Sequence, residues 1–171
     1  MKKVIYVQGI HDMPFKNRKL FKAITTSGFE VIYFPALYSV YSLKKQKELI
    51  SLIEKFIDDL GKKERVTILA HSFGGILAYS LRTDTYKKVD TIMTVASPHN
   101  VGLLNKTKIS LGYNPNVKVK KQVTVGMMND LIVSYKNTRY REGVNHYDIK
   151  GGHECMFNND VCMSRVISEI S

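Results

Sequence analysis

Three residues that could perform nucleophilic chemistry each follow a short apolar run in this sequence. Ser72 lies within "ILAHSFGGILAYS" (68–80), Asp130 follows "QVTVGM", and His153 follows "HYDIKG". A serine hydroxyl is a weak nucleophile until a histidine removes its proton, and a carboxylate is needed to hold that imidazole in the correct tautomer. If the fold brings the three together, they could attack a carbonyl group.

The residues around Ser72 suit a sharp turn from a strand into a helix. In such a turn the serine adopts a strained backbone, so the residues two before and two after it must be small, and here they are Ala70 and Gly74. The turn also points the backbone N–H of Phe73 toward the position where an oxyanion would form. The alternative interpretation of Ser72 is a polar helix N-cap.

The elements that must position these residues can be read from hydrophobic patterns. Six short apolar or β-branched runs of strand length recur, and most of them do not alternate, which favours parallel strands covered on both faces. The predicted strands are "KVIYVQ" (3–8), "EVIYFP" (30–35), "RVTILA" (65–70), "DTIMTVA" (90–96), "QVTVGM" (122–127) and "HYDIKG" (146–151).

Helical periodicity lies between these strands. The predicted helices are 15–27, about 43–60, a run from Ile76 to Leu81, and 161–170. The stretch 98–120 has no convincing period, so we expect a long loop with a short helix near 101–105. Alternating strands and helices predict an α/β fold, a three-layer α/β/α sandwich around a mainly parallel sheet of about six strands.

Open parallel sheets bind ligands at the carboxyl ends of their strands. Gly9, Ser72, Ser97, Asp130 and His153 all follow predicted strands. We therefore expect the fold to place a serine, an aspartate and a histidine at one edge of the sheet.

These residues resemble the α/β-hydrolase family over nearly the whole chain. "AHSFGG" is similar to the nucleophile elbow G-x-S-x-G with Ala70 at the first glycine, "GMMNDLIV" to the acid segment, and "KGGHECMF" to the histidine segment, in the family's order. "VQGIHD" resembles the His-Gly-x oxyanion segment with Gln8 at the histidine position. "TVASPHNVG" is similar to a stretch of lipase-like members.

The resemblance implies a catalytic triad of Ser72, Asp130 and His153, with the backbone N–H groups of Ile10 and Phe73 forming the oxyanion hole. It also implies a minimal, lidless serine hydrolase, because the chain lacks two strands that commonly precede the Gly9 segment and leaves no room for a large lid after the fourth predicted strand.

The residues themselves leave several assignments open. His153 could be an exposed loop histidine, and Asp148 or Asp160 could orient the base in place of Asp130. We interpret His71 as a packing or orienting residue. Cys155 lacks a turn that would present it as a nucleophile, so we interpret it as structural.

Composition narrows the remaining possibilities. The 171 residues carry a formal net charge of +11, and the segment 106–121 holds five lysines (Lys106, Lys108, Lys118, Lys120 and Lys121) and no acidic residue. We expect this segment beside the mouth of the site. A solvated loop is the simplest interpretation, and the sharper hypothesis is that its lysines attract an anionic substrate or a phospholipid surface.

Two cysteines are too few for a disulfide framework, so we expect buried free thiols. The apolar N-terminal run is too short for a signal peptide, and no segment approaches the length of a membrane span. We therefore expect one cytoplasmic domain over residues 1–171 that binds no nucleic acid, needs no cofactor or metal, and makes at most peripheral contact with a membrane. The sequence leaves its oligomeric state open.

The predicted function is hydrolysis of a small-molecule or lipid carboxylic ester, esterase- or lipase-like, through an acyl-enzyme on Ser72. Thioester or amide hydrolysis would use the same residues. The alternative from another class is a non-catalytic protein that keeps the fold and binds a partner.

Overall fold

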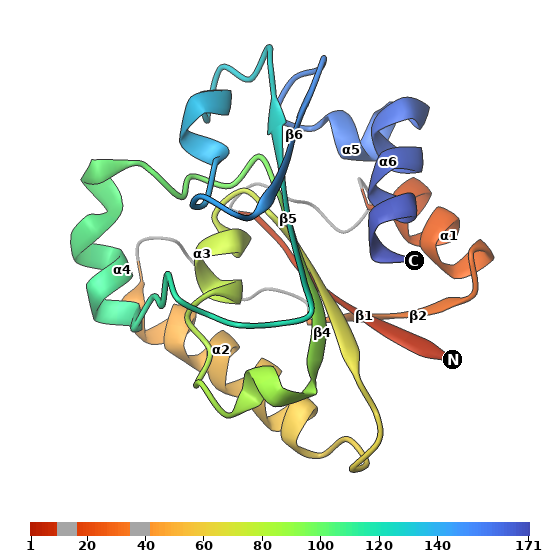
Figure 1. Ribbon diagram of the computed structural model, residues 1–171, viewed down its shortest axis with the longest axis vertical. Coiled ribbons are helices and arrows are strands. Elements are labelled where there is room, and N and C mark those ends of the chain that lie inside the picture. The colour runs from red at the N-terminus through yellow and green to blue at the C-terminus, as the bar shows by residue number, and fades with distance from the viewer. Residues whose placement is uncertain (10–16, 35–41) are drawn as a thin grey trace.

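The fold is a six-stranded parallel sheet between two layers of helices, seen in a computed structural model that describes residues 1–9, 17–34 and 42–171 (Figure 1). The strand order is β2-β1-β3-β4-β5-β6, and every neighbouring pair is parallel. The strands are β1 (Lys2–Val7), β2 (Phe29–Tyr33), β3 (Val66–His71), β4 (Val89–Val95), β5 (Lys121–Met127) and β6 (Asn145–Ile149).

The helices divide between the two faces of this sheet. In Figure 1, α2, α3 and α4 lie on one side of the strands and α1, α5 and α6 on the other. The helices are α1 (Arg18–Thr26), α2 (Leu43–Asp58), α3 (Gly74–Ala78), α4 (Asn105–Leu111), α5 (Cys155–Asn158) and α6 (Asp160–Ile170), and the 3₁₀ turns are η1 (Thr85–Lys88), η2 (Gly102–Leu104) and η3 (Tyr135–Thr138).

Each face of the sheet has its own hydrophobic core. One core packs α2 and α3 against alternate residues of the strands, among them Ile5, Ile68 and Ile92. The other packs α1, α5 and α6 against the intervening residues, such as Leu69 and Met93. Because both faces are buried, the central strands read as continuous apolar runs, as the sequence predicted.

The sequence predicted the architecture correctly but missed the short helices α4 and α5. All six predicted strands are present within about two residues of their expected bounds. Within the expected loop 98–120, the short helix expected near 101–105 is present as the 3₁₀ turn η2, but it is followed by α4, an unexpected helix of seven residues that is capped by Gly112 in the left-handed conformation (φ 72°). The apolar period was hidden because one of the residues that α4 buries is a lysine, Lys108.

None of the helices in the described part of the chain is both long and apolar enough to cross a membrane.

Candidate active site

Ser72 occupies a strained turn between β3 and α3. Its φ of 51° lies in the left-handed region, which a residue with a Cβ adopts only when the surrounding structure holds it there. The Ser72 N–H donates to the carbonyl of Val95 at 2.8 Å, which ties the turn to the end of β4. The strained strand-to-helix turn predicted from the sequence is therefore present.

The glycines after Ser72 let α3 lie close to neighbouring backbone. A Cβ on Gly74 would lie 2.3 Å from the carbonyl oxygen of Val7 and 2.6 Å from that of Gln8, so no side chain fits there. A Cβ on Gly75 would lie 2.3 Å from Oγ of Ser97. The sequence "SFGG" thus packs the turn against the ends of β1 and β4.

Ser72, His153 and Asp130 form one chain of hydrogen bonds. The Oγ of Ser72 lies 2.9 Å from Nε2 of His153, and Nδ1 of His153 lies 2.7 Å from Oδ2 of Asp130. An ionised carboxylate only accepts, so Nδ1–H donates to Asp130, and Nε2 is left to accept from the serine hydroxyl. The structure therefore brings together three residues that are far apart in the sequence.

Asp130 is held as an anion by its surroundings. Its side chain is 0% exposed, and such burial alone would raise its pKa. The His153 ring and the amides of Val133 and Ile132, both 2.8 Å from Oδ1, donate hydrogen bonds that outweigh burial and lower the pKa of Asp130 below its usual value. The site therefore contains an ionised carboxylate beside an imidazole.

The alternatives left open by the sequence have other partners. Asp148 pairs with His146 and Arg139, and Asp160 pairs with Lys19 at the surface. The N-cap of α3 is Phe73 rather than Ser72. Asp130 is thus the carboxylate beside the His153 ring, which is 12% exposed.

The predicted oxyanion groups are placed in part. Phe73 begins the turn into α3, and its backbone (φ −58°, ψ −25°) is already helical. Ile10 lies outside the described residues. Gln8, which stands at the family's histidine position, is buried and accepts a hydrogen bond from the hydroxyl of Tyr33. This bond holds the end of β1, which leads to Ile10, beside β2.

The expectation of free thiols was wrong, because Cys155 and Cys162 form a disulfide across seven positions of sequence. A count of two cysteines excludes a disulfide framework but not a single bond, and this one joins two successive helices, α5 and α6. A local feature could have indicated this bond, because the two cysteines are seven positions apart and each lies at a buried position in the first turn of its helix.

The expected position of the basic segment was wrong for its C-terminal lysines. After α4 the chain crosses to the amino end of β5 (Figure 1), opposite the edge that holds Ser72. There Lys120 pairs with Asp90, and Lys121 pairs with Glu169. Lys108 is buried in α4, where its Nζ donates to the carbonyl of His99 at 2.5 Å. Lys106, in the first turn of α4, and Lys118 are both exposed.

The segment that follows β4 contains a buried histidine. His99 is 3% exposed, and its ring nitrogens lie 2.9 Å from Oγ1 of Thr94 and 3.2 Å from the hydroxyl of Tyr113. Burial, followed by the nearby charge of Lys108, lowers the pKa of His99 to about 3. The ring is therefore neutral, and it serves packing rather than proton transfer.

Comparisons with known proteins agree with this fold. The profile of a family described as "PGAP1-like alpha/beta domain" matches residues 34–166. No curated protein matches the chain in sequence. Among solved structures, an alpha/beta hydrolase enzyme, MGS-MChE2, from the metagenome of lagoon sediments of Mar Chica, Morocco, is similar with a TM-score of 0.75 and 16% identity, over 98% of this chain and 89% of that chain.

Two further structures are similar at comparable levels. A monoacylglycerol lipase from Paleococcus ferrophilus has a TM-score of 0.70 and 12% identity, over 97% of this chain and 92% of its own. A methylesterase, MES16, from Arabidopsis has a TM-score of 0.70 and 12% identity, over 98% of each chain. At these identities the likeness shows the α/β-hydrolase fold alone.

Proposed function

The chain belongs to the family of the PGAP1-like alpha/beta domain, and from this premise we propose that it is a serine hydrolase that cleaves carboxylic esters. The observation that carries the proposal is the hydrogen-bonded chain from Ser72 through His153 to Asp130, placed at the carboxyl edge of a parallel sheet. A strained serine turn, a buried ionised carboxylate and a histidine between them are the parts that acyl transfer requires.

The proposed reaction proceeds in two halves. The Oγ of Ser72 attacks the ester carbonyl while Nε2 of His153 takes the hydroxyl proton, and Asp130 stabilises the imidazolium. The backbone N–H groups of Phe73 and Ile10 donate to the oxyanion. As the tetrahedral intermediate collapses, His153 returns the proton to the leaving alcohol. Water then attacks the acyl-enzyme through the same base, and this step releases the acid and restores Ser72.

The surroundings of Asp130 support a lipid-like ester as substrate. Leu131 is 99% exposed, Ile132 is 67% exposed and Met128 is 53% exposed, all on the segment that follows β5 at the edge of the site. Exposed apolar side chains beside a reaction centre offer a surface for an acyl chain. Two of the structurally similar proteins, the monoacylglycerol lipase and the methylesterase, are ester hydrolases by name.

The charges at this edge favour an anionic substrate. Lys136 follows Asp130 by six positions, Lys150 precedes His153 by three, and both are exposed. Around Lys136, between 97 and 141, the only acidic residue is Asp130, whereas Lys150 has Asp148 and Glu154 close to it in sequence. These cations replace Lys118, Lys120 and Lys121 in the earlier hypothesis, and an anionic lipid ester or a phospholipid surface is the partner that they would attract.

The proposal is tested by ester hydrolysis with the purified protein. A series of p-nitrophenyl esters of graded acyl length should be hydrolysed with saturation kinetics, and Ser72→Ala should abolish turnover while the thermal unfolding temperature stays within a few degrees of the wild type. Thioester and anilide substrates in parallel determine which acyl bond is preferred. Absence of turnover on every acyl substrate by folded wild-type protein would instead favour a non-catalytic binding protein.

A further inference from the structure

The loop that carries His153 is short and partly exposed. It runs from the end of β6 to the start of α5 (residues 150–154), and it contains two successive glycines, Gly151 and Gly152. Glycine backbone is the most flexible in a chain, so such a loop would move freely unless other parts of the molecule held it. Toward β5, the carbonyl of Gly151 accepts from the N–H of Asn129 at 3.0 Å.

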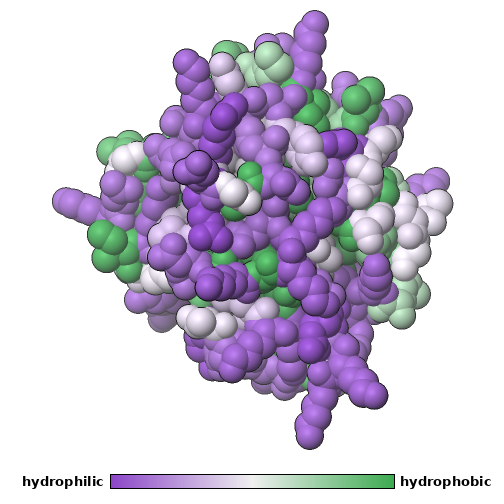
Figure 2. All heavy atoms as spheres, in the orientation of Figure 1, coloured by the Kyte–Doolittle hydropathy of each residue, from purple (hydrophilic) through white to green (hydrophobic). Residues whose placement is uncertain are grey.

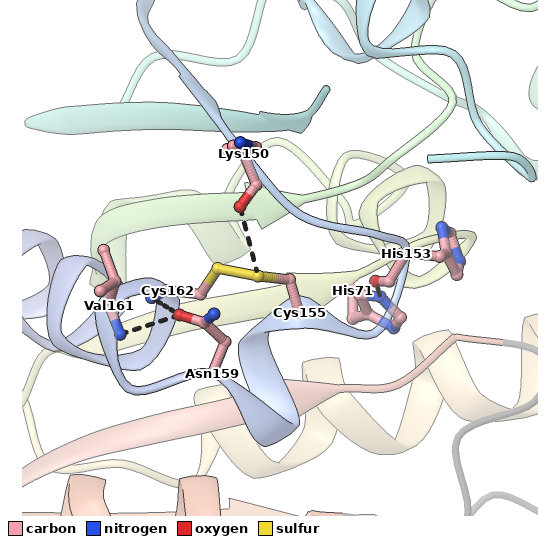
Figure 3. Close-up of a disulfide and its surroundings, with 7 residues drawn as sticks. All are labelled: His71, Lys150, His153, Cys155, Asn159, Val161 and Cys162. Carbon is pink, nitrogen blue, oxygen red and sulfur yellow. Dashed lines mark hydrogen bonds between the residues drawn. A yellow bond between two sulfur atoms is a disulfide. The ribbon is translucent and has the colours of Figure 1, made fainter. Parts of the chain in front are cut away.

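His71 holds the same loop from the sheet side. It is the last residue of β3, directly before Ser72, and is 1% exposed. Its Nε2 lies 2.9 Å from the backbone carbonyl of His153, and because a carbonyl only accepts, Nε2–H is the donor. The ring also lies 4.8 Å from the ring of His153 and 4.9 Å from that of Phe157 in α5. Figure 3 shows the His71 ring pointing at this carbonyl.

The disulfide holds the loop from the helix side. Cys155 follows His153 by two positions and is bonded to Cys162 in α6 (Figure 3). The Sγ of Cys155 packs onto the loop itself: it lies 3.9 Å from the carbonyl oxygen of Lys150, and a Cβ on Gly151 would come within 2.3 Å of it. The side chain of Asn159 caps α6 by accepting from the amides of Val161 and Cys162, so the far end of this tie is also fixed.

We infer that His71 and the Cys155–Cys162 disulfide are positioning groups for His153, and this inference rests on the proposed function. The imidazole of His71 fixes the backbone of the base, while the disulfide fixes the chain two residues later. Together they hold Nε2 of His153 at 2.9 Å from Oγ of Ser72. Proton transfer depends steeply on this distance, since a displacement of about 1 Å can cost about a hundred-fold in rate.

Two substitutions of His71 separate positioning from packing. His71→Phe keeps a ring between His153 and Phe157 but removes the N–H donor, whereas His71→Gln keeps an N–H at a similar reach. We expect His71→Phe to lower kcat for an ester by about ten-fold or more with KM within about two-fold, and His71→Gln to recover most of the loss. The matched control is His146→Gln, a histidine whose ring contacts Thr124 and Asp148.

The disulfide is tested by its removal. Dithiothreitol reduces the bond to two thiols with two electrons and two protons and is itself oxidised to its cyclic disulfide. We expect this treatment to lower kcat of the wild type to the level of the Cys155→Ala/Cys162→Ala double variant, which dithiothreitol should not change further. The far-UV circular dichroism spectrum should stay that of the folded protein in each case.

A readout that needs no turnover separates failure of this inference from failure of the proposed function. The hydrogen bond from Nδ1–H of His153 to Asp130 gives a downfield proton resonance, assigned by its loss in Asp130→Asn. It should be sharp in the wild type, and broadened or lost in His71→Phe and in the double cysteine variant, whether or not the protein hydrolyses esters. Wild-type kcat together with an unchanged resonance in these variants would overturn the inference. Equal losses in His71→Phe and His71→Gln, with matching falls in thermal stability, would reduce His71 to a packing residue.

Discussion

Asp130 accepts hydrogen bonds through both of its carboxylate oxygens, and the two oxygens have different partners. Oδ1 receives the amides of Ile132 and Val133, which shape the loop after β5, and Oδ2 receives Nδ1–H of His153. One oxygen therefore serves the fold and the other serves the candidate site. A substitution that changes only the second role can separate the two.

Asp130→Asn is that substitution. The amide oxygen can keep both backbone hydrogen bonds, but the NH₂ group then faces Nδ1 of His153, which must become an acceptor, so Nε2 carries the proton and can no longer act as a base. We predict that kcat falls by about a thousand-fold while KM and the free energy of unfolding change little. Steady-state kinetics and urea denaturation provide the measurements. A kcat within a few-fold of wild type would mean that Asp130 does not orient the base.

His99 makes a prediction about stability rather than activity. Its pKa in the folded protein is about 3, below the ordinary 6.5 of histidine, because burial disfavours the charged ring. Between these two pH values the unfolded chain binds a proton that the folded protein does not. The contribution of neutral His99 to the free energy of unfolding is therefore intact above pH 6.5. It declines as the pH falls below that value, by up to about 1.4 kcal/mol per pH unit.

His99→Gln removes this titration. The wild type is expected to be the more stable protein at pH 7, and the gap in unfolding free energy should narrow steadily at pH 6, 5 and 4, as measured by urea denaturation. A difference in unfolding free energy between the two proteins that stays constant from pH 7 to pH 4 would show that titration of His99 does not destabilise the folded protein.

At the residue scale the sequence predicted which three side chains the fold brings together, and it left their surroundings open. Ser72 and His153 were identified because a serine between a strand and two glycines, and a histidine after the last strand, are unusual patterns. The family resemblance favoured Asp130 over Asp148 and Asp160, and the fold adds the reason, since Asp130 is the carboxylate that contacts the His153 ring. Pairing across loops of this kind depends on tertiary packing, which a sequence pattern does not encode.

Among the elements, the turn from β3 into α3 determines how close Ser72 lies to the end of β1. Because a Cβ on Gly74 would meet two backbone oxygens, Gly74→Ala must push β1 and α3 apart. We predict a loss of about 2 kcal/mol or more in unfolding free energy, together with a fall in kcat, since β1 leads into the proposed oxyanion segment. Gly102→Ala is the control, because a Cβ added at Gly102 would have no neighbouring atom within 4 Å outside its adjoining residues. Equal stability of the two variants would contradict the close approach.

The elements that the sequence missed share one cause. The helix α4 buries Lys108, and α5 is only four residues long, so neither shows a regular apolar period. The disulfide was missed because a count of two cysteines says nothing about whether α5 and α6 bring them together. Strands were predicted well, because a buried parallel strand shows its environment in its own composition.

The whole molecule is strongly basic. The face in Figure 2 is mostly hydrophilic, with hydrophobic residues in small separate groups. With a net charge of +11, the protein should attract anions over distances comparable to the Debye length, about 10 Å at 0.1 M salt.

The disulfide bears on the cellular location. Disulfides persist mainly in oxidising compartments, so the Cys155–Cys162 bond does not favour the cytoplasmic location expected from the sequence, and that expectation stays a prediction. The expectation of a single domain also stays a prediction.

The charge hypothesis predicts a salt effect that depends on the substrate. For an anionic ester, kcat/KM should fall several-fold between 20 mM and 500 mM NaCl, while a neutral ester of the same acyl length should be unaffected. Lys136→Gln/Lys150→Gln should reduce this salt dependence. The control variant Lys62→Gln/Lys63→Gln removes the same number of charges before β3, at the opposite edge of the sheet. It should leave the salt dependence of kcat/KM nearly unchanged. Equal effects of the two double variants would show that only the net charge matters.

The central claim is that Ser72 is an activated nucleophile. The most direct measurement is the intact mass of the folded protein after reaction with a fluorophosphonate, followed by mapping of the modified peptide. We predict one phosphonyl adduct per chain on the peptide that contains Ser72, formed much more slowly in His153→Ala and absent in Ser72→Ala. Folded wild-type protein that stays unmodified, or an adduct on another residue, would contradict the account.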